Sequence, residues 1–301
     1  MKDKKIAVYE ELLQCIYCKS QLKYVRSNFV CQKCARKYPY KDGIAICLGD
    51  ESAHMLKQAQ IYDDEYAKKS YGTKLEYWQQ AYIKRIAQMF DLDKPQATPK
   101  RYLDVGAGPG HTVIRLAQNN LTSIGCDISL TGAQQAMKMA RRAGVFDRVY
   151  YVVCDARNLP FKKQSIDYIS CIMLLEHLEH DDEVIGDMAR ILKKGGSVYV
   201  AVPNTYLHFW FFMWPINYWH DRRLGHLRHY SANTLRRLMN QQKLDTVSVF
   251  YSAHLIKFVQ LFYQKAPKKY QKKLWWFLES LDEAQHKVPT GLHLNGVFRK
   301  K

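Results

Sequence analysis

The sequence lacks any apolar run long enough to cross a lipid bilayer. Its longest, Leu207–Trp219, is shorter than the roughly 20 residues that a membrane-spanning helix needs, and it contains His208 and Asn217. The first residues, MKDKKIAVYEELLQ, are charged and lack the apolar stretch of a secretory signal. We therefore expect neither a transmembrane helix nor a signal peptide.

Acidic residues are few relative to basic ones. The 28 Asp and Glu stand against 46 Lys and Arg, which gives a formal net charge of +18, whereas the 47% hydrophobic content is ordinary for a soluble globular protein. Such an excess favours a polyanionic partner, either nucleic acid or an anionic membrane surface. A basic, soluble surface is the third interpretation, and charge alone does not decide among them.

The cysteines do not indicate a disulfide framework. Cys126, Cys154 and Cys171 lie in apolar, strand-like segments, where a free cysteine behaves as a small hydrophobic residue. This distribution favours a reducing compartment. We expect a cytoplasmic protein, with a peripheral place at a membrane as an alternative.

Four further cysteines form two C-x-x-C hooks: Cys15 with Cys18, and Cys31 with Cys34. Two such hooks complete a tetrahedral site with no coordination position left for a substrate, so we predict a structural zinc ion. A redox dithiol is the alternative, but it usually occurs as a single pair.

The segment around the hooks, LLQCIYCKSQLKY…FVCQKCARKYPYKDGIAIC, resembles the zinc-ribbon domain of the small activator subunit that partners several tRNA and protein methyltransferases. The resemblance covers about residues 10–50 and includes Tyr38–Ile44. It implies that residues 1–50 form a module that is structural or that docks a partner.

Residues 51–98 are predicted to form a helical lead-in and a linker. Apolar and aromatic residues recur there at intervals of three and four, and DKPQATPK precedes the first strand of the next domain. Such a lead-in could place Tyr62 or Tyr71 against a cofactor, although a packing role is favoured for both.

The segment RYLDVGAGPGHT predicts a strand that turns sharply into a helix. Asp104 precedes three glycines at every second position, Gly106, Gly108 and Gly110. Glycine tolerates positive φ and lets a ligand rest against the backbone, and the helix N-terminus suits an anion. A nicotinamide or flavin fingerprint would carry its third glycine at position 111, where the sequence has His111.

Two more carboxylates follow predicted strands. Asp127 ends Thr122–Asp127, where it is placed to accept hydrogen bonds from ribose hydroxyls, with capping of the next helix as the alternative. Asp155 follows Val149–Cys154 and could accept from an adenine amine, while the backbone N–H of Ala156 donates to the ring. Further strands are expected at Arg101–Val105, Ile166–Met173, Ser197–Val202, Asp245–Tyr251 and Gly291–Arg299. Strand and helix units in this order predict an α/β, doubly wound, mostly parallel sheet.

The D-x-G-x-G-x-G pattern and the segment CDARNLPF resemble class I S-adenosylmethionine-dependent methyltransferases over roughly residues 99–301. The resemblance implies a seven-stranded sheet that ends in an antiparallel pair. It also implies that the three glycines approach the methionine and ribose portions of the cofactor and that Asp104 holds its amino-acid end. Asp127 would hold the ribose, and Asp155 with Ala156 the adenine.

The segment HDRRLGHLRHYSANTLRRLM resembles the H-x-R-x-[FY]-S-x-x-x-L-x-x-L segment of methyltransferases that act on small molecules, quinones and lipid-linked or sugar substrates. It places His226 at the histidine position. A histidine near the methyl acceptor could act as general base. Alternatively, His226 orients the start of the helix at Ser231, and the sequence leaves both roles open.

An aromatic insert, residues 206–230, contains YLHFWFFMWPINYW. It could form a lid over a hydrophobic acceptor, a membrane wedge with Trp210, Trp214 and Trp219, or buried packing. A second amphipathic segment, Lys268–Glu283, begins with four lysines and is predicted to carry Tyr270, Leu274, Phe277, Leu278 and Leu281 on one face. Basic residues with aromatics on a helix fit an anionic membrane surface, although a core face is the commoner meaning.

The sequence as a whole predicts a zinc ribbon fused to an S-adenosylmethionine-dependent methyltransferase. The expected acceptor is a hydrophobic or lipid-linked small molecule met at an anionic membrane surface. An RNA base methyltransferase is the first alternative, although no N-P-P-Y-like tetrapeptide for a flipped base is present. A non-catalytic scaffold for another methyltransferase is the second. The intact glycines and carboxylates disfavour it.

Overall fold

The computed structural model describes residues 4–49, 53–68, 75–92, 100–119, 121–205, 218–219, 221–223, 225–254 and 265–301. Residues 206–217 of the expected insert 206–230 lie outside these residues, as does Tyr71. No helix among the described residues is long and apolar enough to cross a membrane.

The N-terminal module, residues 4–49, is one helix and four short strands. Helix α1 (Lys4–Leu12) precedes β1 (Leu22–Val25), β2 (Asn28–Cys31), β3 (Lys37–Lys41) and β4 (Ile44–Ile46). The strands pair consecutively and antiparallel. Two helices follow before the next strand, α2 (Ala53–Lys68) and α3 (Tyr77–Met89).

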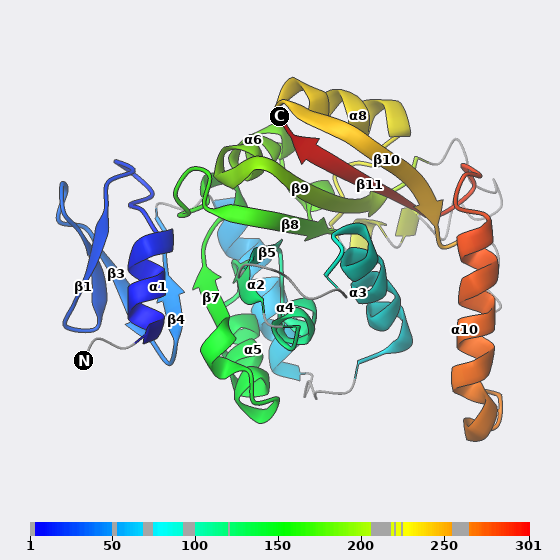
Figure 1. Ribbon diagram of the computed structural model, residues 1–301, viewed down its shortest axis with the longest axis horizontal. Coiled ribbons are helices and arrows are strands. Elements are labelled where there is room, and N and C mark those ends of the chain that lie inside the picture. Colours follow the sequence, from blue (N-terminus) through cyan, green and yellow to red (C-terminus); the bar gives the residue numbers. More distant parts are fainter. Residues whose placement is uncertain are drawn as a thin grey trace.

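Alternating strands and helices make up the rest of the chain. In order they are β5 (Arg101–Val105), α4 (His111–Ala117), β6 (Thr122–Asp127), α5 (Leu130–Arg142), β7 (Val149–Val153), β8 (Ile166–Ile172), α6 (Asp181–Ile191), β9 (Leu192–Pro203), α8 (Ala232–Gln241), β10 (Leu244–Ser252), α10 (Lys268–Ala284) and β11 (His293–Lys300). Helices α4 and α5 cover one face of the sheet, and α6 and α8 cover the other (Figure 1). The predicted α/β, doubly wound, mostly parallel sheet is confirmed.

Among the described residues, the sheet has eleven strands in the order β1-β2-β3-β4-β7-β6-β5-β8-β9-β11-β10, so the expected total of seven was too low. The seven strands β5 to β11 make the predicted arrangement, in which β11 lies antiparallel between β9 and β10. The other four come from the N-terminal module, because β4 pairs parallel with β7. An uncovered β7 would expose a row of unpaired backbone groups, and β4 satisfies them.

The N-terminal module also shares a hydrophobic core with the larger sheet. Tyr9 and Phe29 of the module belong to one buried cluster with Val152, Phe161 and Val200. Figure 1 shows the module in blue at the β7 end of the sheet. The N-terminal module and the larger sheet are therefore built as one continuous structure.

Helix α10 carries the apolar residues that the sequence predicted for one face, and Tyr270, Phe277 and Leu281 of this set are exposed. Trp275 and Leu278 are buried, whereas Tyr270 and Phe277 are 51% and 59% exposed. The buried side of α10 packs on α3, where Glu279 forms a buried ion pair with Arg85.

Candidate active site

The glycine turn lies where β5 ends, beside the carboxyl end of β6. The backbone N–H groups of Gly106 and Ala107 donate to the carbonyl of Cys126, at 2.9 and 3.0 Å, which holds the turn against β6. Gly108 adopts a φ of +49°, and a Cβ built there would lie 2.6 Å from the Tyr66 hydroxyl oxygen. A side chain at this position would strain the backbone and would require the Tyr66 ring to move.

Asp127 bonds back to that turn. Its carboxylate accepts hydrogen bonds from the backbone N–H of Gly108 at 2.8 Å and of Ser129 at 2.9 Å. Burial raises the pKa of Asp127, while these hydrogen bonds lower it. The N-terminus of α5 is capped by Ser129, whose hydroxyl accepts from the Gly132 N–H at 2.9 Å. Asp127 is thus placed at the turn and does not cap α5 itself.

Asp104 is buried beneath the turn, where Ser170 of β8 donates a hydrogen bond to its carboxylate. Burial raises the pKa of Asp104 to about 7. A cationic group bound above the turn would favour the ionised carboxylate.

Asp155 lies at the end of β7 with its carboxylate turned to Arg157. The guanidinium group approaches Asp155 at 2.6 and 2.9 Å, and the backbone N–H of Arg157 donates at 2.8 Å. Asp155 and Asn158 line a hollow of about 250 Å³ with Tyr17 of the N-terminal module. An adenine amine would therefore share Asp155 with Arg157.

Helix α2 lies over the glycine turn. Asp63 accepts a hydrogen bond from the Thr131 N–H at 3.0 Å, which fixes α2 to the start of α5. Tyr62 and Tyr66 stack with ring centroids 5.9 Å apart, and the Tyr62 hydroxyl lies 3.5 Å from His177 Nε2. Tyr62 is therefore placed between the glycine turn and the residues that follow β8.

The residues that follow β8 belong to a cluster of acids and histidines. Glu176 and His177 follow β8, and a ligand atom of each lies within 4.8 Å of one on His226. The rings of His177 and His226 meet edge to face with centroids 4.8 Å apart. Burial raises the pKa of Glu176 to about 8. The sequence assigned no role to Glu176 or His177, although an adjacent acid and histidine directly after a predicted strand was an available signal.

Asp221 orients the histidines of this cluster. Its two carboxylate oxygens lie 2.8 Å from His226 Nδ1 and 2.9 Å from His229 Nε2. His229 Nδ1 lies 2.6 Å from the Asn204 carbonyl oxygen. Both ring nitrogens of His229 thus lie within hydrogen-bond distance of an acceptor oxygen, which fixes the orientation of the ring. The Nδ1 atom of His226 faces Asp221, and Nε2 lies on the other edge of the ring.

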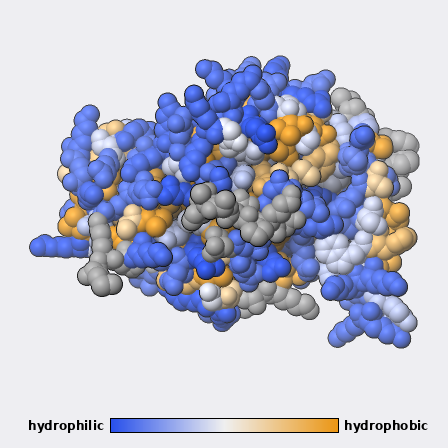
Figure 2. Space-filling model, viewed as in Figure 1, coloured by the Kyte–Doolittle hydropathy of each residue, from blue (hydrophilic) through white to orange (hydrophobic). Residues whose placement is uncertain are grey.

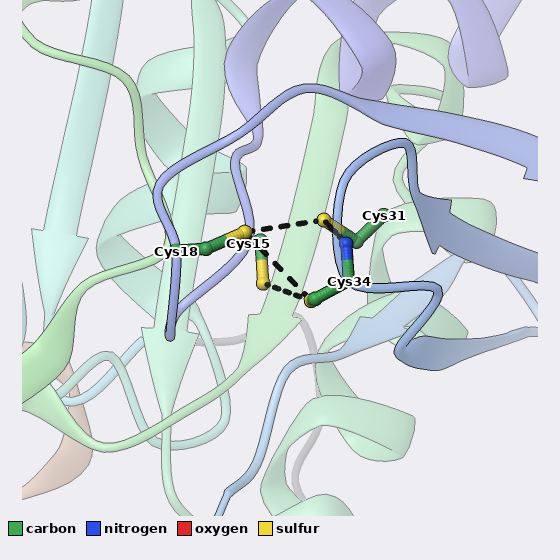
Figure 3. A group of neighbouring side chains, drawn as sticks. All are labelled: Cys15, Cys18, Cys31 and Cys34. Carbon is green, nitrogen blue, oxygen red and sulfur yellow. Dashed lines mark hydrogen bonds between the residues drawn. The ribbon is translucent and has the colours of Figure 1, made fainter.

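The four cysteines of the two hooks meet in the N-terminal module (Figure 3). The Sγ atoms of Cys18 and Cys31 lie 3.4 Å apart, those of Cys15 and Cys34 3.6 Å, and those of Cys18 and Cys34 3.7 Å. Thiolates on one tetrahedral zinc ion, each bound at about 2.3 Å, lie about 3.8 Å from one another. The donor set therefore fits zinc, and the separations are too long for disulfides.

The structure brings most of the predicted site residues into two groups. Asp104, the three glycines and Asp127 meet at the ends of β5 and β6, and Asp155 with Ala156 follows the neighbouring strand β7. His226 joins the cluster after β8, on the other side of β5. In this order of strands, ligands bind at the carboxyl ends.

Sequence and structure comparisons agree with this geometry. The profile of a family described as "Methyltransferase domain" matches residues 74–249. The chain is 30% identical to a norajmaline N-methyltransferase of Rauvolfia serpentina over 41% of each chain. It is 35% identical to a 27-O-demethylrifamycin SV methyltransferase of Amycolatopsis mediterranei, over 36% of this chain and 42% of that protein. The chain thus spans about two fifths of the length of these curated relatives.

A similar fold occurs in the phosphoethanolamine N-methyltransferase 2 of Haemonchus contortus, solved with S-adenosyl-L-methionine. The TM-score is 0.52 at 20% identity, and the alignment covers 74% of this chain and 52% of that one. With the family profile matched over more than half of its residues, the chain belongs to the methyltransferase-domain family and carries a class I S-adenosylmethionine-dependent methyltransferase domain.

Proposed function

We propose that the protein transfers the methyl group of S-adenosylmethionine to a hydrophobic or lipid-linked small molecule, at an anionic membrane surface. The observation that carries the transfer is the glycine turn with Asp104 and Asp127 beside it, next to a separate cluster of acids and histidines. The names of the curated relatives support a small acceptor. They do not favour RNA as the substrate.

Each residue of the candidate site has a defined part in this proposal. The cofactor supplies an electrophilic methyl group when it is bound. Asp127 and the turn at Gly108 hold its ribose, Asp104 attracts its amino group, and Asp155 with Ala156 holds its adenine. Tyr62 separates this pocket from the acceptor side, where His226 lies. The general-base role of His226 stays a prediction.

The N-terminal module is proposed to hold one structural zinc ion on Cys15, Cys18, Cys31 and Cys34. The sulfur separations support it. With four thiolates bound, the ion has no position for a substrate. Its task is then to fix the two hooks and, through β4, the β7 edge of the sheet.

The membrane location is proposed from helix α10. Lys268, Lys269, Lys272 and Lys273 are exposed at its beginning, together with Tyr270. Figure 1 shows α10 along one edge of the molecule, and Figure 2 shows hydrophilic residues at its lower end. Basic residues near an anionic membrane each add about 1 kcal/mol to binding.

The transfer is tested with labelled cofactor. Purified protein, S-adenosylmethionine labelled in its methyl group, and a fractionated cell extract should yield a labelled product in the lipid-soluble small-molecule fraction, identified by mass spectrometry. Label found only in RNA or protein would contradict the proposed acceptor. The same incubation with Gly108→Val protein should give no labelled product.

A further inference from the structure

We propose that Glu176, His177 and His226 bind a divalent transition-metal ion beside the cofactor turn, separate from the cysteine site. One ligand atom from each lies within 4.8 Å of the others. Ligands of a tetrahedral ion bound at about 2.1 Å lie about 3.4 Å apart, so a modest side-chain rotation would bring the three together. Two imidazoles and one carboxylate are a donor set of known catalytic metal sites, in which the remaining position stays open.

The state of Glu176 is the second observation. Its side chain is fully buried, and neither carboxylate oxygen has a hydrogen-bond partner among the described residues. A buried acid without a partner is costly, and such groups are usually paired or coordinate a metal. An ion between Glu176 and the two histidines would supply the missing partner.

Asp221 provides the third observation. Ligating histidines almost always donate their second N–H to a carboxylate or carbonyl, which fixes the ring and its tautomer. His226 does so, from Nδ1 to Asp221 at 2.8 Å. Asp221 is in turn held by His229, whose Nε2 lies 2.9 Å from its second carboxylate oxygen. Asp221 thus fixes the orientation of the His226 ring within the cluster.

The choice of ion follows from the donors. Imidazole nitrogen suits zinc, cobalt, nickel and iron, whereas magnesium and calcium prefer oxygen ligands only.

The position of the cluster indicates what the ion would do. Leu174, two residues before Glu176, packs directly on the glycine turn, since a Cβ on Gly106 would lie 3.1 Å from its side chain.

Resting on the proposed methyl transfer, the ion would bind a hydroxyl oxygen of the acceptor beside the methyl group and lower the pKa of that hydroxyl. The oxygen then forms the bond to the methyl carbon, the electron pair of the broken carbon–sulfur bond stays on sulfur, and the hydroxyl proton leaves to water. The acceptor class is therefore an alcohol or phenol. A His226 that ligates an ion does not act as the base.

The test is titration of Co²⁺ into the full chain loaded with a single equivalent of Zn²⁺, which the four thiolates take up first, followed by calorimetry and visible absorption. We expect one Co²⁺ per chain. Glu176→Gln and His226→Asn should each weaken uptake by about tenfold or more, and Asp221→Asn by about 10- to 100-fold. The sequence offers matched controls three positions away, Glu179→Gln and His180→Gln, because both side chains are exposed and should bind Co²⁺ as the parent does.

No uptake by the parent protein would overturn the proposal, as would unchanged uptake in Glu176→Gln and His226→Asn. Circular dichroism identifies a variant that does not fold. If one of these two variants is unfolded, Co²⁺ uptake by the other decides the outcome. Cofactor binding is measured on the same samples without Co²⁺. If the parent protein takes up Co²⁺ but does not bind S-adenosylmethionine, the proposed function is contradicted and the metal site is retained. If it binds S-adenosylmethionine but takes up no Co²⁺, only the metal site is contradicted.

Discussion

The Tyr9 hydroxyl joins the N-terminal module to the main sheet at Tyr151. It accepts the backbone N–H of Tyr151 at 2.8 Å and lies 2.8 Å from the carbonyl oxygen of Gly43 and 3.0 Å from that of Tyr151. Tyr151 in turn donates its own hydroxyl to the carbonyl of Gly108. Two buried tyrosines therefore connect α1 to the cofactor turn.

Tyr9→Phe should destabilise the protein by about 1–3 kcal/mol, because buried backbone groups of Tyr151 and Gly43 lose their partner. Urea unfolding measures the change. Tyr24→Phe is the matched control, since Tyr24 packs on the same Phe29 ring but is only half-buried. Its free energy of unfolding should change by less than about 0.5 kcal/mol. Equal effects of the two substitutions would contradict the proposed role of the Tyr9 hydroxyl.

Asp127→Ala should weaken S-adenosylmethionine binding by about 1.5–3 kcal/mol, because the ribose loses a charged acceptor. Gly108→Val should abolish binding, since its side chain would meet Tyr66 and strain the turn. Calorimetry measures both. Asp147→Ala, an exposed aspartate near β7, should bind as the parent does. Unchanged affinity in both site variants would remove the cofactor assignment.

Cofactor affinity should depend on pH through Asp104. Its pKa is raised to about 7 in the cofactor-free protein, so the carboxyl is largely protonated below pH 7 and must release that proton when a cationic amino group binds. Affinity should therefore rise about tenfold from pH 6 to pH 8. The same raised pKa stabilises the cofactor-free protein most below about pH 4, and that stabilisation is lost as the pH rises through about 7.

Calorimetry in buffers of different ionisation enthalpy measures the released proton at pH 6.5. Asp104→Asn should show no such release and a flatter pH profile, whereas Asp147→Asn should behave as the parent. A proton release that persists in Asp104→Asn would assign the titration to another group.

Removal of zinc should affect more than the N-terminal module. Cys34→Ser protein should lose the tightly bound zinc, and its midpoint temperature should fall, because loosening of β4 uncovers the β7 edge. Elemental analysis and thermal unfolding measure the two effects. Cys171→Ser, in buried strand β8, should retain zinc whatever its stability. If the parent protein is prepared with ample metal and still contains no zinc, the predicted zinc site is contradicted.

Membrane binding should depend on the four lysines of α10. Replacing Lys268, Lys269, Lys272 and Lys273 by glutamine should release most of the protein from anionic vesicles, as should high salt, because the attraction is screened over about 10 Å at 0.1 M. Co-sedimentation measures it. The control removes the same charge elsewhere, at the exposed lysines Lys33, Lys37, Lys57 and Lys138. Equal losses in the two variants, or no binding by the parent, would contradict a membrane role for α10.

Features that depend on neighbouring residues were predictable from the sequence. The glycine turn needs positive φ at Gly106, Gly108 and Gly110, and all three have it. Each C-x-x-C hook bends within four residues, and alternating strands and helices admit few topologies. The bounds of β5 and β6 came out as expected because apolar runs and glycines mark them.

Only the tertiary structure decided which distant segments meet. Nothing local in Ile44–Ile46 shows that it pairs with β7, because any exposed strand edge could accept it. Glu176 and His226 are far apart in the chain, and their meeting depends on how the segment before α8 returns across the end of β8. The exposed and buried faces of α10 likewise follow from its contact with α3. Periodicity alone does not encode this contact, because an amphipathic pattern gives a face but not its partner.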